Sequence, residues 1–440
     1  MRAGRRPERV SEMGSLRRLL AAVALALGGA GAALLIAELL LRLFGIYYPP
    51  GGAFFVPDRY TGWGNRAGAE GASDVECPSH VRINSDGLRD REHSSAKPPG
   101  VLRVAVLGDS FTEALQVPME RDFCSVLERR LGGCEALRDL RPEVINFGVS
   151  GYGTAQELIT LQRKVWKYSP DVVVLAYFPG NDLYDNARDL QDFDPGEAPG
   201  PRPFFYYDGG GTLALDNSFR SSPRLLATPD RILYGSTFLK FLWRLRTWQV
   251  LNRLRSVGAV QSLFGVARAL RLAWSSGKLF PDIFARGEVL DRRVLNPPAD
   301  ARWREAWRVT EGIITEMHRE VANHGARFLL VVLSEELQVY PGERGRARLL
   351  RKAGVADPLY PNRRLEALAR TDGFGFLSCT EPLQRYADQH HAFVHGCSEH
   401  SLGHGHWNAL GHELAGSLIA AKVCEMLRQP AMGSTKRALP

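Results

Sequence analysis

The stretch Val101-Leu-Arg-Val-Ala-Val-Leu-Gly-Asp-Ser-Phe-Thr112 decides the fold, because a run of apolar and β-branched residues ends abruptly at Gly108 and a helix-like pattern follows. Such a continuous run is typical of a parallel strand that is buried on both faces. In α/β folds, the residues that follow the carboxyl end of such a strand line the crevice where ligands bind. Ser110 is therefore either a nucleophile in that crevice or the cap of the next helix.

Strands and helices alternate along the rest of the chain, with an interruption between residues 187 and 298. This alternation predicts an α/β fold in which helices cover both faces of a central parallel sheet, a three-layer α/β/α sandwich. The expected strands are 101–107, 144–147, 172–177, 328–333 and 374–377, and the expected helices are 122–131, 154–168, 301–323, 362–369 and 410–427.

The composition narrows the function classes. A charged fraction of 24% over 440 residues argues against disorder throughout, and the net charge of +8 comes without any nucleic-acid-binding motif. We therefore expect no nucleic acid partner. The cysteines show no C-x-x-C spacing, so they predict neither a zinc ribbon nor a thioredoxin-like site. Local disulfides between Cys124 and Cys134, or between Cys379 and Cys397, are candidates if the domain is exported.

The amino end predicts a membrane anchor. A basic tail of residues 1–18 precedes nineteen uncharged residues, Leu19 to Ala37, which as a helix would span roughly 28 Å. Glu38 and Arg42 follow one turn apart and are expected to pair. We therefore expect residues 19–44 to cross a membrane once, with the amino end cytoplasmic and the remainder periplasmic or otherwise extracytoplasmic. The alternative is a signal peptide that is cleaved near Ala30.

Two segments fall outside the α/β pattern. Residues 45–100 are rich in Gly, Pro and polar residues and predict an extended approach segment, with a short strand at 80–84. Residues 187–298 form a loop and a helical insertion, in which 231–281 carries nine basic residues and no acidic one. This insertion is either a lid over the site or a contact with an anionic membrane surface. Residues 101–428 then form the catalytic domain, and 429–440 a tail.

Three further stretches supply chemistry near Ser110. A glycine-rich turn after the second strand contains Gly151, whose lack of a side chain lets a backbone N–H approach a substrate, and Asn181 follows the third strand. His406 precedes the last helix. A serine needs a histidine to take its proton, and the tetrahedral oxyanion needs fixed donors, so this set predicts acyl transfer at an ester. Seven histidines lie between His390 and His412, yet their spacing and the lack of an acidic ligand predict no metal site and no cofactor.

These stretches resemble the four sequence blocks of the SGNH, or GDSL, hydrolase superfamily, and the chain is similar to its bacterial membrane-anchored members. Gly108-Asp-Ser-Phe111 is similar to the first block, the Gly151 turn to the second, Gly180-Asn-Asp182 to the third and the His406 motif to the fourth. The resemblance implies a flavodoxin-like sandwich. It also implies that Ser110 is the nucleophile, that His406 is the general base and then acid, and that an oxyanion hole is formed by Ser110, Gly151 and Asn181.

One departure from the family concerns the acid of the triad. Members usually carry an aspartate two or three residues before the histidine, where this chain has His404 and Gly403. Glu399 is a weak candidate for that role, and a Ser-His dyad is the alternative. The leading function is a serine ester hydrolase acting on an acylated small molecule or polysaccharide. Its alternatives are an O-acyltransferase on an envelope polysaccharide and a non-catalytic carbohydrate- or lipid-binding relative.

Overall fold

The computed structural model describes residues 8–43, 54–73, 76–190, 202–221, 247, 292–397 and 401–429. The chain forms two units. One comprises Met1–Pro50 with Arg231–Ala273, and the other comprises Gly51–Asp230 with Trp274–Pro440. Of the basic insertion 231–281, only Thr247 belongs to the described residues, so the membrane-contact and lid interpretations of that insertion lie outside them.

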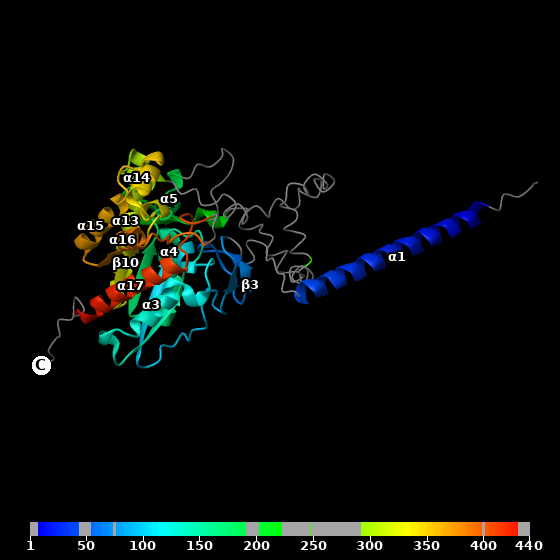
Figure 1. Cartoon of the computed structure of the whole chain (residues 1–440), viewed down its shortest axis with the longest axis horizontal. Coiled ribbons are helices and arrows are strands. Elements are labelled where there is room, and N and C mark those ends of the chain that lie inside the picture. The colour runs from blue at the N-terminus through cyan, green and yellow to red at the C-terminus, as the bar shows by residue number, and fades with distance from the viewer. Residues whose placement is uncertain are drawn as a thin grey trace, which may run out of the picture. The chain divides into compact units, whose positions relative to one another are not determined.

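The larger unit is built on five parallel strands (Figure 1). Their order in the sheet is β11-β10-β7-β5-β6, which is the flavodoxin-like order. The predicted α/β class and the central parallel sheet are therefore confirmed. The strands are β5 (Val101–Gly108), β6 (Arg141–Asn146), β7 (Val172–Tyr177), β10 (Arg327–Val332) and β11 (Gly375–Ser378).

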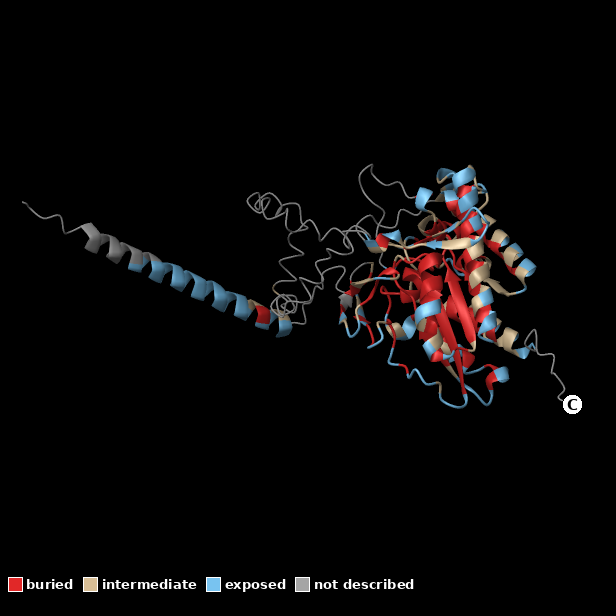
Figure 2. Cartoon of the chain, turned by 180° about the vertical axis from the view of Figure 1, so that it is seen from behind, coloured by how far each residue is buried: buried red, intermediate tan, exposed pale blue. Residues whose placement is uncertain are grey.

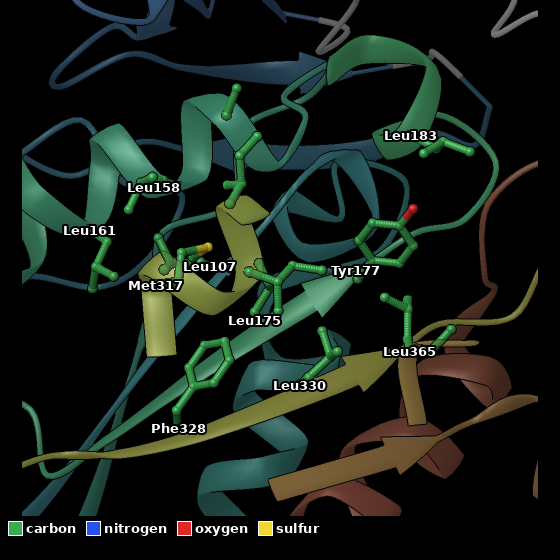
Figure 3. Packing of buried hydrophobic residues seen from close by; sticks show 14 of the residues in the cluster. Leu107, Leu158, Leu161, Leu175, Tyr177, Leu183, Met317, Phe328, Leu330 and Leu365 are labelled. Atoms are coloured by element: carbon green, nitrogen blue, oxygen red, sulfur yellow. The ribbon is translucent and has the colours of Figure 1, made fainter. Parts of the chain in front are cut away.

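Helices cover both faces of this sheet because successive side chains of each strand point to opposite faces. Leu107, Leu175 and Leu330 pack with α4 (Thr154–Thr160), α13 (Ala301–Asn323) and α15 (Tyr360–Asp372) on one face. Figure 3 shows this cluster, with Met317 of α13 beside Leu107 and Leu175. On the other face, the neighbouring strand positions Val106, Val174 and Val331 pack with three further helices. These are α3 (Phe123–Leu131), α16 (Thr380–His390) and α17 (Ala409–Arg428).

Strands β5 and β7 are buried along their whole length and β10 nearly so (Figure 2), which agrees with their largely apolar sequences. The edge strand β11 is only partly buried. Every predicted strand and helix of the α/β pattern is present, within a few residues of its expected ends. The predicted helix 154–168 continues beyond α4 as a π-helical stretch, Leu161–Val165, and a 3₁₀ turn, Trp166–Tyr168. The structure adds elements that the periodicity did not predict, namely α2 (Ser110–Glu113), α5 (Asp182–Asn186), α14 (Glu343–Lys352), α16 and the hairpin of β8 (Phe204–Tyr207) and β9 (Leu213–Asp216).

The expected approach segment is more than a linker. Residues 54–100 belong to the same compact unit as the sheet and contain two antiparallel pairs. Trp63, Val81 and Ile83 of this segment are buried in one cluster with Val149 and Tyr152 of the glycine-rich turn. The segment is therefore packed against the expected catalytic domain. The pairs are β1 (Phe55–Asp58) with β2 (Gly62–Asn65), and β3 (Glu70–Ser73) with β4 (Ser79–Arg82).

Two disulfides join parts of the chain that are far apart in sequence. Cys77 pairs with Cys397 and Cys134 with Cys424, at Cα–Cα distances of 6.1 and 5.9 Å. The expected local pairs were wrong, because Cys124 and Cys379 are buried in the hydrophobic core and neither forms a disulfide. Proximity in the sequence was a poor guide, since the fold brings both carboxyl-terminal partners to distant segments.

The smaller unit contains α1 (Glu8–Leu43). Within the described residues, Leu20–Leu43 is the one stretch long and apolar enough to cross a membrane, with a mean hydropathy of 2.3. Arg42 Nε lies 2.8 Å from Glu38 Oε1, so the predicted pair one turn apart is present. An amino-terminal apolar helix together with two disulfides is typical of a protein that works outside the cytoplasm.

Candidate active site

Ser110 lies where β5 ends, and the local sequence explains how it is presented. A Cβ at Gly108 would lie 2.1 Å from Thr112 Oγ1, so the close turn leaves room only for glycine. Asp109 is the N-cap of α2, with Oδ1 accepting a hydrogen bond from Phe111 N–H at 2.9 Å. Because Asp109 caps this helix, the Ser110 side chain is available for another contact.

That contact is with His406. Ser110 Oγ lies 2.7 Å from His406 Nε2, and His406 Nδ1 lies 2.6 Å from Glu76 Oε1. A carboxylate can only accept, so Nδ1 carries the proton and Nε2 accepts from the serine hydroxyl. The three side chains thus form one hydrogen-bonded chain, in the order serine, histidine, carboxylate, that general-base activation of a serine requires.

The loop before α17 sets the orientation of the His406 ring. Gly405, at φ +77°, lies so close to the Glu76 carboxylate that a Cβ there would be 2.6 Å from Oε1. On the other side, Gly396 N–H donates to His406 O at 3.0 Å, and the ring packs against Phe111 with 4.7 Å between centroids. The His406 N–H also donates to Glu76 Oε2 at 3.1 Å. The carboxylate therefore holds both the backbone and the ring of His406.

The electrostatics favour an ionised Glu76. Burial by itself would raise the pKa of this carboxyl, but hydrogen bonds from His406 and the charge on its ring outweigh burial and hold the pKa below its usual value. Glu76 therefore presents a negative charge to the imidazole at neutral pH. Such a charge stabilises the imidazolium that forms when histidine takes a proton.

Gly151 and Asn181 follow β6 and β7, the two strands that flank β5 in the sheet. The residue before Gly151 is held firmly, because Ser150 N–H donates to Glu113 Oε2 at 2.7 Å and Trp63 Nε1 donates to Ser150 O at 2.9 Å. Gly151 itself has φ +76°, a conformation that favours glycine. Asn181 is the N-cap residue of α5 and is 9% exposed.

Sequence reasoning missed Glu76. It stands in the segment that was expected to be a linker, and 330 residues separate it from His406. The earlier candidate for the acid, Glu399, lies outside the described residues. The neighbouring Cys77 could have pointed to Glu76, because Cys77 pairs with Cys397 near His406. The spacing of the cysteines does not predict that pair, however.

Two other histidines of the carboxyl-terminal stretch, His395 and His412, make structural contacts. His395 and His412 are buried, and burial lowers the pKa of His395 to about 4 and that of His412 as well, so both stay neutral. His395 Nδ1 donates to Gly405 O at 2.6 Å, and His412 Nδ1 accepts from Phe123 N–H at 3.2 Å. Among the residues that the structure describes, no group of three or more His, Cys, Asp or Glu could hold a metal ion.

Three carboxyl groups, those of Asp109, Glu157 and Asp182, are fully buried behind the turns that carry Ser110 and Asn181. Burial raises the pKa of Glu157 and of Asp182, and the charge of Asp109 raises both further. Asp182 Oδ2 accepts from Phe178 N–H at 2.8 Å and so closes the loop that carries Asn181. We infer that Glu157 and Asp182 retain protons at pH values where the unfolded chain has lost them.

Replacing Glu157 with glutamine is therefore expected to stabilise the protein at pH 8 by roughly 1 kcal/mol or more. When folding raises the pKa of a carboxyl, the contribution of that carboxyl to the free energy of unfolding is fully present at low pH. This contribution is lost as the pH rises from the pKa in the unfolded chain toward the pKa in the folded protein. The gain should vanish below about pH 4. Urea unfolding at pH 4, 6 and 8 measures it, and exposed Glu120→Gln serves as control. An equal or smaller stability of Glu157→Gln at pH 8 would contradict the inference.

No family model and no curated protein matches the chain. Among solved structures, an acetylxylan esterase from Geobacillus stearothermophilus matches 74% of this chain and 96% of its own, at 8% identity and a TM-score of 0.34. A GDSL-like lipase from Bacteroides thetaiotaomicron matches 74% of this chain and 88% of its own, at 11% identity and a TM-score of 0.30.

Proposed function

We propose that the chain is a serine ester hydrolase of the SGNH, or GDSL, type, which cleaves an acyl ester outside the cytoplasm. The observation that carries the proposal is the hydrogen-bonded chain from Ser110 Oγ through His406 to Glu76. Glu76 takes the place of the aspartate that the sequence lacks near His406. The nucleophile, the base and the orienting carboxylate are then all present.

In the proposed reaction, Ser110 Oγ attacks the ester carbonyl while His406 Nε2 takes its proton. The tetrahedral oxyanion is stabilised by the N–H groups of Ser110 and Gly151 and by the Asn181 amide. The imidazolium then gives its proton to the leaving alkoxide, which departs as an alcohol and leaves Ser110 acylated. Water then attacks the acyl group while His406 Nε2 takes its proton. The imidazolium returns this proton to Ser110 Oγ as the bond to the acyl group breaks, which releases the carboxylic acid and restores the serine hydroxyl.

Two features support the oxyanion hole. Gly151 and Asn181 come from the two strands beside β5, so their positions converge at the carboxyl edge of the sheet, where Ser110 lies. The turns that carry them are held by buried carboxyl groups, since Glu113 accepts from Ser150 N–H and Asp182 accepts from Phe178 N–H. Donors fixed in this way need no rearrangement when the negative charge develops.

The test is turnover of nitrophenyl acetate and of longer-chain nitrophenyl esters by the full-length protein in detergent. We expect release of nitrophenol together with covalent labelling of Ser110 by a fluorophosphonate, detected as a mass shift of one adduct. Release that increases when a sugar acceptor is added would favour acyl transfer over hydrolysis. If the protein shows neither turnover nor labelling, the proposal is overturned and the non-catalytic binding role remains.

We also propose that α1 remains attached as a single-pass anchor with its amino end in the cytoplasm. The apolar span Leu20–Leu43 follows Arg17 and Arg18, and 24 residues of helix extend roughly 36 Å, enough to cross a bilayer. The intact mass of protein extracted from membranes is expected to include these residues. A mass that begins near Ala32 would indicate a cleaved signal peptide instead.

A further inference from the structure

We infer that the Cys77–Cys397 disulfide is the device that positions Glu76 against His406. The pair Glu76–His406 is assembled from two segments that are 330 residues apart. Cys77 directly follows Glu76, and Cys397 directly follows Gly396, whose N–H donates to His406 O. The disulfide thus lies one residue from Glu76 on one side and one residue from a backbone partner of His406 on the other.

The hydrogen bonds of the Glu76 carboxylate show how local this arrangement is. Among the described residues, its contacts within hydrogen-bond distance are His406 Nδ1 at 2.6 Å and His406 N–H at 3.1 and 3.3 Å. Within that part of the chain, all of them reach the segment across the disulfide and none reaches the strand pair of Glu76 itself. Without the covalent link, these contacts would have to hold Glu76 against the conformational entropy of the loop between β3 and β4.

The partner segment is ordered from its own side. His395 and Trp407 form a bridge, and Asn408 Nδ2 donates to Phe393 O and Gly396 O at 2.9 and 3.0 Å. Cys397 N–H also donates to Ser401 Oγ at 3.2 Å. The loop that carries His406 is therefore closed on itself, and Cys397 offers a fixed point for attachment.

The segment that contains Glu76 is also anchored independently of the disulfide, beyond Cys77. Strand β4 pairs with β3, Val81 and Ile83 are buried, and Ser79 Oγ donates to Leu115 O. Loss of the disulfide should consequently leave the fold in place and release Glu76 alone. This separates a positioning role from a general contribution to stability.

Dependence of the Glu76–His406 contact on a disulfide also restricts the compartment in which the enzyme works. Disulfides form and persist in oxidising compartments and are rare in the cytosol. Assembly of the complete serine-histidine-carboxylate chain is then tied to export, and the chain would have low activity before it leaves the cytoplasm.

The test compares Cys77→Ala/Cys397→Ala with the matched double variant Cys134→Ala/Cys424→Ala, both as full-length protein in detergent. The second disulfide links residues after α3 to α17 and has no contact with Ser110 or His406 among the described residues. Its removal should lower the melting temperature and leave the pH profile unchanged. Removal of Cys77–Cys397 should lower kcat at least tenfold at unchanged KM and shift the acid limb of kcat/KM to lower pH, because imidazolium loses its neighbouring charge.

A double-variant comparison identifies the target of the effect. In a Glu76→Gln background, removal of Cys77–Cys397 should change kcat less than threefold, because the group that it positions is already absent. A loss as large as in the parent protein would show that the disulfide acts on something else and would overturn the inference. Wild-type kcat and pH profile in Cys77→Ala/Cys397→Ala would overturn it as well.

The inference rests on the proposed function for its kinetic readout, so a second readout is independent of turnover. The Nδ1 proton of a histidine that donates to a carboxylate resonates far downfield in proton NMR spectra. We expect this resonance of His406 in the wild type and in Cys134→Ala/Cys424→Ala, and its loss in Glu76→Gln and in Cys77→Ala/Cys397→Ala. If the resonance behaves in this way but the wild type is inactive, only the proposed hydrolase function is refuted. If the resonance is retained without Cys77–Cys397, the positioning role of the disulfide is refuted.

Discussion

Replacing Ser110 with alanine is expected to reduce kcat/KM for nitrophenyl acetate by about 10⁴-fold or more. The hydroxyl whose proton His406 Nε2 accepts is the only group in the proposed chain that forms the acyl-enzyme, so its removal eliminates covalent catalysis. Binding and oxyanion stabilisation would remain and leave a small residual rate. Steady-state kinetics together with loss of fluorophosphonate labelling measure the effect.

The matched control for this prediction is Ser417→Ala. Ser417 lies on α17, and its hydroxyl donates to Glu413 O at 2.8 Å within the same helix. Its removal should leave kcat/KM within a factor of about two, because helix surfaces tolerate alanine well. Retention of more than a tenth of wild-type activity by Ser110→Ala would contradict the assignment of the nucleophile.

Replacing Glu76 with glutamine is expected to reduce kcat by about 10² to 10⁴-fold. Glutamine preserves the shape of the side chain but removes the charge that stabilises imidazolium and that selects the tautomer with the proton on Nδ1. Because the neutral imidazole is the base, activity falls where the ring becomes protonated. Without the carboxylate that protonation occurs at lower pH, so the acid limb of the kcat/KM profile should shift downward.

The control for Glu76 is Glu70→Gln in the same amino-terminal segment. Glu70 lies on β3, is largely exposed and pairs with His80 at 2.9 Å. Exposed pairs of this kind contribute little, so Glu70→Gln should show wild-type kcat and an unshifted pH profile. If Glu76→Gln also shows wild-type kcat and an unshifted pH profile, Glu76 has no role in catalysis and the site is a serine-histidine dyad.

Much of the fold could be predicted from local patterns. The apolar runs that became β5 and β7 are buried on both faces, so the sequence needs no polar alternation and the strand reading is unambiguous. Helix α13 was predicted because its apolar positions repeat at the helical period. Helix α16, whose buried residues are Thr380, Leu383 and Ala387, was missed although it is amphipathic.

Part of the candidate site could also be predicted from the sequence. Ser110, Gly151 and Asn181 each follow a strand of the parallel sheet, and the carboxyl ends of parallel strands meet at one edge. The sequence order of strands therefore predicts that these residues converge. His406 could be placed beside them through its position before the last helix and the block that it resembles. Ser110 and His406 do meet, with 2.7 Å between Oγ and Nε2, whereas the roles of Gly151 and Asn181 stay predictions.

The sequence by itself determined the α/β class and the edge of the sheet at which Ser110 and His406 meet, since periodicity and glycine turns act over a few residues. Only the tertiary structure decided which carboxylate stands behind His406 and which cysteines pair. Glu76 and Cys77 lie in a segment with little periodicity, and their partners are more than 300 residues away. Such contacts depend on how packed layers bring loops together, and no short-range pattern records that.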